Sequence, residues 1–177
     1  MAECPDWFAD MIRIGYLTGM RQGEVHKLRW RHINLNTRII SFHGTETKEG
    51  NPKRIPIHKN LFPIFDIIGK VRSLTDDRIF KTSSKSLRMP WVRALDKLRW
   101  SDPRPRFHDL RHTWKTNARR SGIDSEIREA ILGHSNRSLD VSERYGIISD
   151  EELVQAIDRF TYDNGLTQIL VAAAAKK

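Results

Sequence analysis

Apolar residues recur at helical spacing along most of the chain. Between residues 6 and 17 the large apolar side chains return every three or four positions, and Asp6 is suited to cap the first turn. A Thr-Gly pair at 18–19 then breaks the pattern, which predicts one helix over residues 6–17 and a short one over 22–28. The same periodicity predicts five further helices, over residues 59–72, 86–98, 107–120, 124–132 and 149–160. In the last of these, Ser149 and Glu152 have the spacing of a capping box.

An alternating pattern replaces the helical one between residues 38 and 57. Ile40 and Phe42 fall on one face of a predicted strand over 38–42, a Gly-Asn-Pro turn follows, and residues 54–57 can pair back. Because Pro56 cannot donate to a ladder, the second strand belongs at an edge. The predicted fold class is therefore α+β, a mainly helical domain with a small antiparallel β-hairpin sheet.

The composition fits one domain with a polyanionic partner. A chain of 177 residues can bury one ordinary core, and neither an internal repeat nor an obvious linker divides it, so we expect a domain over 1–160 and a C-terminal tail over 161–177. Lysine and arginine number 31 against 22 acidic residues, giving a net charge of +9. That excess favours nucleic acid, although charge alone also fits a basic soluble protein or one that meets acidic membranes.

Cysteine content and hydropathy indicate an intracellular protein. The single Cys4 excludes an intramolecular disulfide and suits a reducing compartment. The first ten residues do not have the pattern of a signal peptide, and the longest apolar run, 169–175, is far too short to cross a bilayer. We therefore expect a cytoplasmic, nucleoid-associated protein in a bacterial or phage-infected cell, with no membrane partner.

The predicted helix over 107–120 carries the densest candidate chemistry. His108 and Arg111 share one face, which Lys115 and Arg119 continue, while the opposite stripe is apolar: Phe107, Leu110, Trp114 and Ala118. Taken alone, this segment is better explained as a solvated basic face. Zinc binding by His108 and His112 is a weaker alternative, because Asp109 replaces the usual glutamate base, Arg111 would lie beside the metal, and no third ligand follows at a fitting distance. We expect no metal and no cofactor.

Three other short motifs are individually weak. Arg21 lies where a glycine break meets a short helix, and Glu24, one turn on, could orient its guanidinium. A Leu-Gly-His sequence at 132–134 ends another helix with a glycine. Tyr145 follows eleven residues after His134 in a polar context, although an isolated tyrosine is generally a packing residue.

Taken together and in this order, the motifs resemble those of the tyrosine recombinases, the phage integrase family. The pattern is Thr-Gly-x-Arg-x-x-Glu at 18–24, a hairpin lysine, His-x-x-Arg at 108–111, Leu-Gly-His at 132–134, and a tyrosine. The resemblance covers about residues 6–160. It implies six catalytic residues and a supporting Glu24: Arg21, Lys48, His108, Arg111, His134 and Tyr145.

Two assignments within this resemblance had competitors. Lys53 lies in the same hairpin as Lys48, and the Thr-Lys-x-Gly context favours Lys48. Tyr162 is the rival nucleophile, but it lacks the Glu-Arg sequence that precedes Tyr145. The interval from His134 to Tyr145 is longer than the commonest family spacing, which predicts an insertion around residues 136–140.

The resemblance also implies a fold and a reaction. The fold is that of DNA breaking-rejoining enzymes, and the reaction is site-specific recombination of double-stranded DNA through a 3′-phosphotyrosyl intermediate, with four subunits acting in turn. A type IB topoisomerase-like enzyme and a non-catalytic DNA-binding regulator are the alternatives. Integrases usually carry further DNA-binding domains upstream, which nothing before Asp6 could supply, so we expect an isolated catalytic domain, monomeric by itself, with weak and salt-dependent DNA binding.

Overall fold

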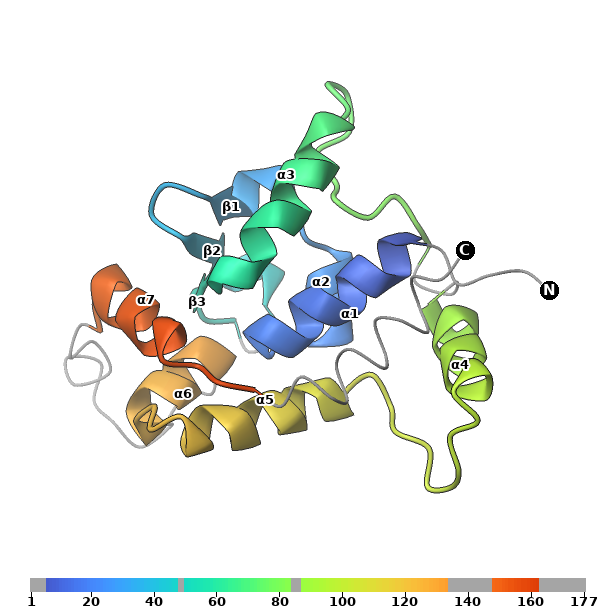
Figure 1. Cartoon of the computed structure of the whole chain (residues 1–177). Helices are drawn as coiled ribbons and strands as arrows, with labels where there is room; N and C mark the ends of the chain where they lie inside the picture. The colour runs from blue at the N-terminus through green and yellow to red at the C-terminus, as the bar shows by residue number, and fades with distance from the viewer. Residues whose placement is uncertain (1–5, 48–49, 84–86, 134–147, 163–177) are drawn as a thin grey trace.

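Helix α1 (Asp6–Thr18) lies at the centre of the computed structural model, which describes residues 6–47, 50–83, 87–133 and 148–162 (Figure 1). Phe8, Met11 and Ile12 are fully buried, so the apolar stripe read from the sequence is the face that enters the core. Helix α5 (Asp109–Arg120) packs along α1 and runs below it in Figure 1.

The predicted helices are present, with shifts at their ends. They are α2 (Gln22–His26), α3 (Phe62–Lys70), α4 (Arg88–Lys97), α6 (Ser125–Leu132) and α7 (Asp150–Asp158). The segment predicted as a helix over 59–72 begins instead as a short 3-10 turn, Lys59–Leu61, and becomes α-helical where Pro63 sets the backbone of the first turn. The described helices include none that is both long and apolar enough to span a membrane.

The sheet has three antiparallel strands, one more than predicted. Strands β1 (Ile33–Asn34), β2 (Ile39–Phe42) and β3 (Lys53–Pro56) are ordered β1-β2-β3, with Ile40 opposite Ile55. Pro56 therefore lies in an edge strand, as its missing N–H requires. Strand β1 was missed because two residues are too short to show an alternating pattern. The α+β fold class is confirmed.

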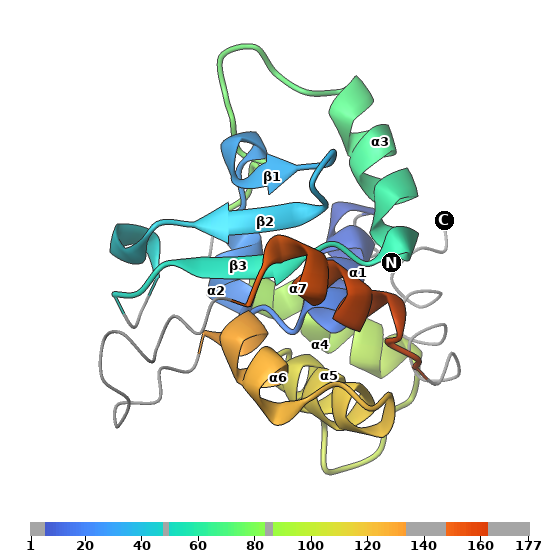
Figure 2. The same ribbon diagram turned by 90° about the vertical axis from the view of Figure 1, so that its left-hand side faces the viewer.

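Helices α6 and α7 lie against β3, as Figure 2 shows from the side of the sheet. Arg38, just before β2, forms a two-pronged ion pair with Asp158 at 2.6 and 2.9 Å, and Arg54 of β3 binds Asp150 at 2.7 Å. The predicted capping box starts α7, since the Ser149 amide donates to Glu152 at 2.7 Å. These contacts fix α7 across the sheet edge, and Phe160 stacks on Trp114 of α5 beyond its end.

The first two residues of the predicted tail are attached to the domain. The Thr161 amide donates to Ser121 Oγ at 2.8 Å, and the Tyr162 ring packs edge-on against Tyr16. Residues 163–177 lie outside the described residues, so the tail itself stays a prediction. Tyr162, the rival nucleophile, is therefore packed against the domain.

Candidate active site

Arg111 joins three segments that are far apart in the sequence. Its Nη1 donates to the carbonyl of Gly19 and its Nη2 to the carbonyl of Leu132, each at 2.8 Å. The side chain is only 5% exposed, which excludes the solvated basic face as an explanation for this arginine. The predicted apolar stripe beside it is buried throughout: Phe107, Leu110, Trp114 and Ala118.

Two glycines shape the backbone that receives Arg111. Gly19 ends α1 at φ +67°, and a Cβ there would lie 2.9 Å from Cδ2 of Trp114. Gly133 caps α6 at φ +70°, a left-handed conformation that glycine adopts without strain. The ends of both helices at these glycines were predicted. Each turn places a backbone carbonyl, that of Gly19 or that of Leu132, next to α5.

Arg21 begins α2 in contact with Glu24. The Arg21 amide donates to Glu24 Oε2 at 2.9 Å, and its Nη1 lies 3.3 Å from Oε1. This is the contact expected from the spacing of the two residues. It holds the arginine at the point where the chain turns out of α1.

The residue that sequence reasoning left aside is Lys53. Its side chain is 2% exposed, and its Nζ lies 2.9 Å from Glu24 Oε2. Burial lowers the pKa of Lys53 to about 8, with Glu24 opposing that shift and the charges of Arg111 and Arg21 adding to it. Burial also works against the charge of Glu24, but Lys53 and the Arg21 amide outweigh it, so the pKa of Glu24 lies below its usual value.

His108 precedes the first turn of α5 and lies within the field of both arginines. Partial burial is the main cause that lowers its pKa, and the nearby charges of His112, Arg111 and Arg21 act in the same direction. A lower pKa favours the neutral form of the imidazole, the form that can accept a proton. The rings of His108 and His112 are 4.8 Å apart, yet within the described ranges no group of three or more histidine, cysteine or acidic side chains could hold a metal ion.

Three predicted site residues, Lys48, His134 and Tyr145, lie outside the described residues. Two of them directly follow a residue that is well placed. The Thr47 hydroxyl contacts the carbonyl oxygens of Gly44 and Asn51 at 3.0 and 2.8 Å, which fastens the base of the hairpin loop. Gly133 packs over the Lys53 side chain, directly before His134.

A groove of about 790 Å³ leads away from Arg21 between α2, the hairpin and residue 78. Five basic side chains line it against two glutamates: Arg21, Lys27, Arg29, Arg31 and Arg78. One of the glutamates, Glu46, is bound by Arg31 at 2.8 Å, and this ion pair is the main cause that lowers its pKa to about 2. Neither Arg111 nor His108 lines the groove, so the cluster of site residues lies at its Arg21 end.

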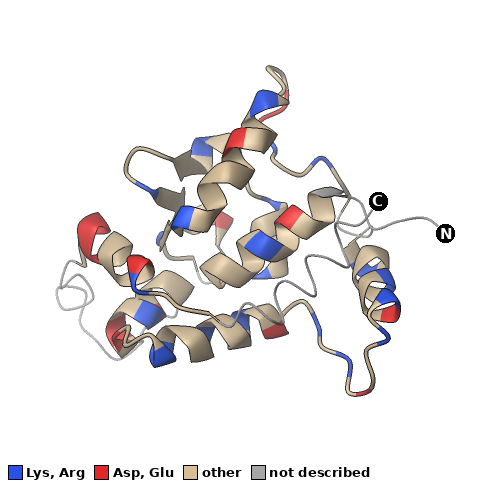
Figure 3. Ribbon diagram, in the orientation of Figure 1, with Lys and Arg blue, Asp and Glu red and all other residues tan. Residues whose placement is uncertain are grey.

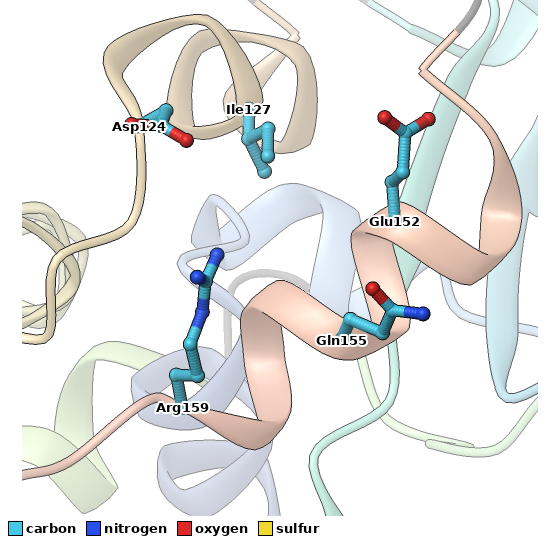
Figure 4. A pocket seen from close by; sticks show the side chains of 5 residues that line it. All are labelled: Asp124, Ile127, Glu152, Gln155 and Arg159. Atoms are coloured by element: carbon cyan, nitrogen blue, oxygen red, sulfur yellow. The ribbon is translucent and has the colours of Figure 1, made fainter.

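Lysine and arginine residues are also frequent along α4 and the segment after it, where the ribbon of Figure 3 is blue at several positions. A second, smaller depression of about 330 Å³ lies between α6 and α7. Figure 4 shows its lining, which mixes acidic, amide, apolar and basic groups: Asp124, Ile127, Glu152, Gln155 and Arg159. It shares no residue with the cluster around Arg111.

The described residues thus form an α+β domain in which Arg21, Arg111 and His108 lie close enough to interact electrostatically, and Arg21 lines the end of a groove rich in basic residues. Comparison with known proteins gives the family. Residues 2–145 match the model of the phage integrase family. The chain belongs to this family, the tyrosine recombinases, as its motifs predicted.

Individual relatives agree with the family match. The chain is 30% identical to the shufflon-specific DNA recombinase of Escherichia coli over 142 residues, which cover 80% of this chain and 35% of the relative. It is 28% identical to tyrosine recombinase XerA of Pyrococcus furiosus over 157 residues, or 84% of this chain and 53% of that protein. The integrase from mycobacterium phage Brujita has the same fold, with a TM-score of 0.67 and 18% identity over 99% of this chain and 59% of that one. The chain thus spans about a third to three fifths of the length of these relatives.

Proposed function

We propose that this chain is the catalytic domain of a site-specific recombinase that cleaves and rejoins DNA through a covalent 3′-phosphotyrosyl intermediate. The observation that carries the proposal is the position of Arg111, whose guanidinium binds the turn before Arg21 and the carbonyl of Leu132. One side chain thereby connects three of the five motifs on which the family resemblance rests. The family match ends at residue 145, which includes the proposed nucleophile Tyr145 and leaves out Tyr162.

The residue types suit attack on a phosphodiester. Charge builds on the phosphoryl oxygens during in-line attack, and two guanidiniums, Arg21 and Arg111, match that geometry with permanent positive charge. They supply the stabilisation that Mg²⁺ gives elsewhere, so the reaction needs neither metal nor cofactor.

The proton transfers complete the step. The Tyr145 oxygen forms a bond to phosphorus as the bond from phosphorus to the 5′ oxygen breaks. The phenol proton, normally lost at a pKa of about 10, passes to a histidine. His108 is suited to accept it because its lowered pKa favours the neutral imidazole, while His134 is the other candidate. Lys48 donates a proton to the departing 5′ oxygen. A 5′ hydroxyl from another strand reverses the reaction, so the energy of the ester is kept and no ATP is used.

Double-stranded DNA is the proposed substrate, with its backbone passing along the basic groove toward Arg21. Exchange of strands between two duplexes requires four active sites, so we propose that four copies assemble on DNA and act in turn. Sedimentation of the protein with and without a synapsed pair of sites measures this directly.

The decisive experiment uses a nicked DNA substrate that traps the covalent adduct. The parent chain is expected to give an adduct that survives a denaturing gel, and Tyr145→Phe is expected to give none, because phenylalanine has no attacking oxygen. Tyr162→Phe is the matched control and should retain the adduct, since the Tyr162 hydroxyl accepts a hydrogen bond from Asn60 in a packed position. An adduct that persists in Tyr145→Phe contradicts the assignment.

The same assay separates the alternatives. A regulator on this fold binds DNA without forming an adduct. A topoisomerase-like enzyme forms the adduct and relaxes one supercoiled molecule, but does not transfer a strand to a second duplex. Inhibition by a chelator would instead indicate a zinc hydrolase.

A further inference from the structure

Lys53 is a buried cation in the wall of the candidate active site. In β3 it alternates with Arg54, so it points inward like Ile55, and its side chain is 2% exposed. Gly133 packs over the aliphatic part of this side chain, so closely that a Cβ at Gly133 would lie 3.1 Å from Lys53 Cδ. A buried ammonium is costly unless it is paired, and the partner of Lys53 is Glu24 at 2.9 Å.

The Glu24 carboxylate is divided unequally between Lys53 and Arg21. Oε2 accepts from Lys53 Nζ and from the Arg21 amide, both at 2.9 Å. Oε1 lies 3.3 Å from the Arg21 guanidinium, longer than the distance of about 2.7–2.9 Å typical of a charge-assisted hydrogen bond. Lys53 is thus the closer counter-ion, and the arginine is oriented by Glu24 without being its main ionic partner.

We propose that Lys53 is a positioning residue for DNA cleavage: it binds the Glu24 carboxylate and thereby keeps the charge of the Arg21 guanidinium available to the scissile phosphate. The inference rests on the proposed function and deepens it. Lys53 acts through Glu24, in contrast to Lys48, to which the proton transfer is assigned. Without Lys53, the carboxylate would turn to Arg21 and compete with phosphate for its charge.

The groups that face Lys53 give this arrangement a pH dependence. They are Glu24, Arg21 and Arg111, which act on its charge from α2 and α5. Because burial lowers the pKa of Lys53 to about 8, the ammonium loses its proton as pH rises through that value, and Glu24 then loses its counter-ion. An arginine at this position stays charged over the same range.

The first test compares initial rates of adduct formation on the nicked substrate. We expect Lys53→Met to be about 10- to 100-fold slower than the parent, as for a misplaced catalytic group, with a much smaller change in DNA affinity. Lys53→Arg should recover most of the rate, and its rate should not decline near pH 8 as that of the parent does. Lys70→Met removes an exposed lysine of α3 and should match the parent. A Lys53→Met variant as fast as the parent overturns the proposal.

A second variant pair guards against a simple folding defect. In a Glu24→Gln background, Lys53→Met leaves no unpaired buried carboxylate, and removal of both charges from a buried pair is often tolerated. We expect Lys53→Met to cost far less rate in this background than in the parent. An equal loss in both backgrounds would mean that Lys53 does not act through Glu24, and would overturn the inference.

Binding of inorganic phosphate separates this inference from the proposed function. Phosphate binding to the free protein, followed by the Arg21 amide resonance, should weaken several-fold in Lys53→Met and stay unchanged in Lys70→Met. If the parent forms no adduct but shows this difference, the recombinase proposal fails, and what stands is that Lys53 controls phosphate binding at Arg21. If the parent forms the adduct and neither rate nor phosphate binding responds to Lys53→Met, the role of Lys53 fails alone.

Discussion

Arg111 illustrates at the scale of one residue why arginine and lysine are not interchangeable. The planar guanidinium reaches the Gly19 and Leu132 carbonyls at the same time, each at 2.8 Å, from a side chain that is 5% exposed. A lysine ammonium is a single point at the end of a flexible stem and cannot bridge two such acceptors in the same way. The site is therefore held together by the shape of this side chain as well as by its charge.

We expect Arg111→Lys to lower the free energy of unfolding by about 1.5–3 kcal/mol, the usual value of a hydrogen bond to a charged group. Urea unfolding with an unchanged denaturant slope measures the loss. Arg119→Lys, on the exposed part of the same helix, is the control and should stay within about 0.5 kcal/mol of the parent. If the two variants were equally stable, the carbonyl bridge would contribute nothing measurable to the fold.

Some of these residues could be read from the sequence and others could not. The contact of Arg21 with Glu24 follows from their spacing at a helix start, and the family motif identified both. Backbone carbonyls are chemically the same in every sequence, so nothing in the order of residues revealed that Gly19 and Leu132 would receive Arg111. The inward position of Lys53 did have a signal, its alternation with Ile55, but the predicted strand began one residue later, at Arg54.

At the scale of elements, hydrophobic periodicity predicted the long helices better than the short strands. Helices such as α1 and α5 have enough turns for a stripe to stand out against chance, and both were predicted to within two residues at either end. Strand β1 has only two residues, too few to show an alternating pattern. It is recognised as a strand by its pairing with β2, a tertiary contact that the local sequence does not reveal. Glycines in the sequence marked the turns between elements. The packing that requires a glycine there, such as the contact of Gly19 with Trp114, could not be predicted.

The turn between α1 and α2 allows a test with a matched control. Gly19→Ala places a methyl group 2.9 Å from Trp114 in a left-handed backbone conformation, whereas Gly122→Ala meets nothing within 4 Å at nearly the same φ. The left-handed backbone conformation is expected to lower the free energy of unfolding of either alanine variant by about 1–2 kcal/mol. The contact with Trp114 in Gly19→Ala should lower it by about 1–3 kcal/mol more. We expect thermal unfolding to show a markedly larger loss for Gly19→Ala. Equal losses would mean that Trp114 moves aside and that the turn is not fixed by packing.

At the scale of the whole molecule, the structure shows where part of the net charge of +9 is concentrated. Composition indicated a polyanionic partner without saying where it binds. The groove from Arg21 to Arg78 concentrates five of the basic side chains beside the candidate active site. A groove with a predominantly basic lining attracts a DNA backbone at several points, and such phosphate contacts set the register of the DNA without reading its base sequence.

This arrangement predicts how DNA binding responds to salt. Each phosphate contact removed should make the plot of log affinity against log salt shallower by about 0.9, because one fewer counterion is released. Lys27 lines the groove with an exposed side chain, so Lys27→Gln is expected to weaken binding to duplexes of any sequence and to reduce the slope by roughly this amount. Lys70→Gln removes the same charge from α3, where the side chain is 71% exposed and lies outside the groove lining, and should leave the slope unchanged.

Fluorescence anisotropy at several salt concentrations measures both slopes in the Tyr145→Phe background, where no adduct forms under the proposed mechanism. Equal slopes for the two variants would show that overall charge, and not the groove, attracts the DNA, and the substrate would then have to approach Arg21 from another side.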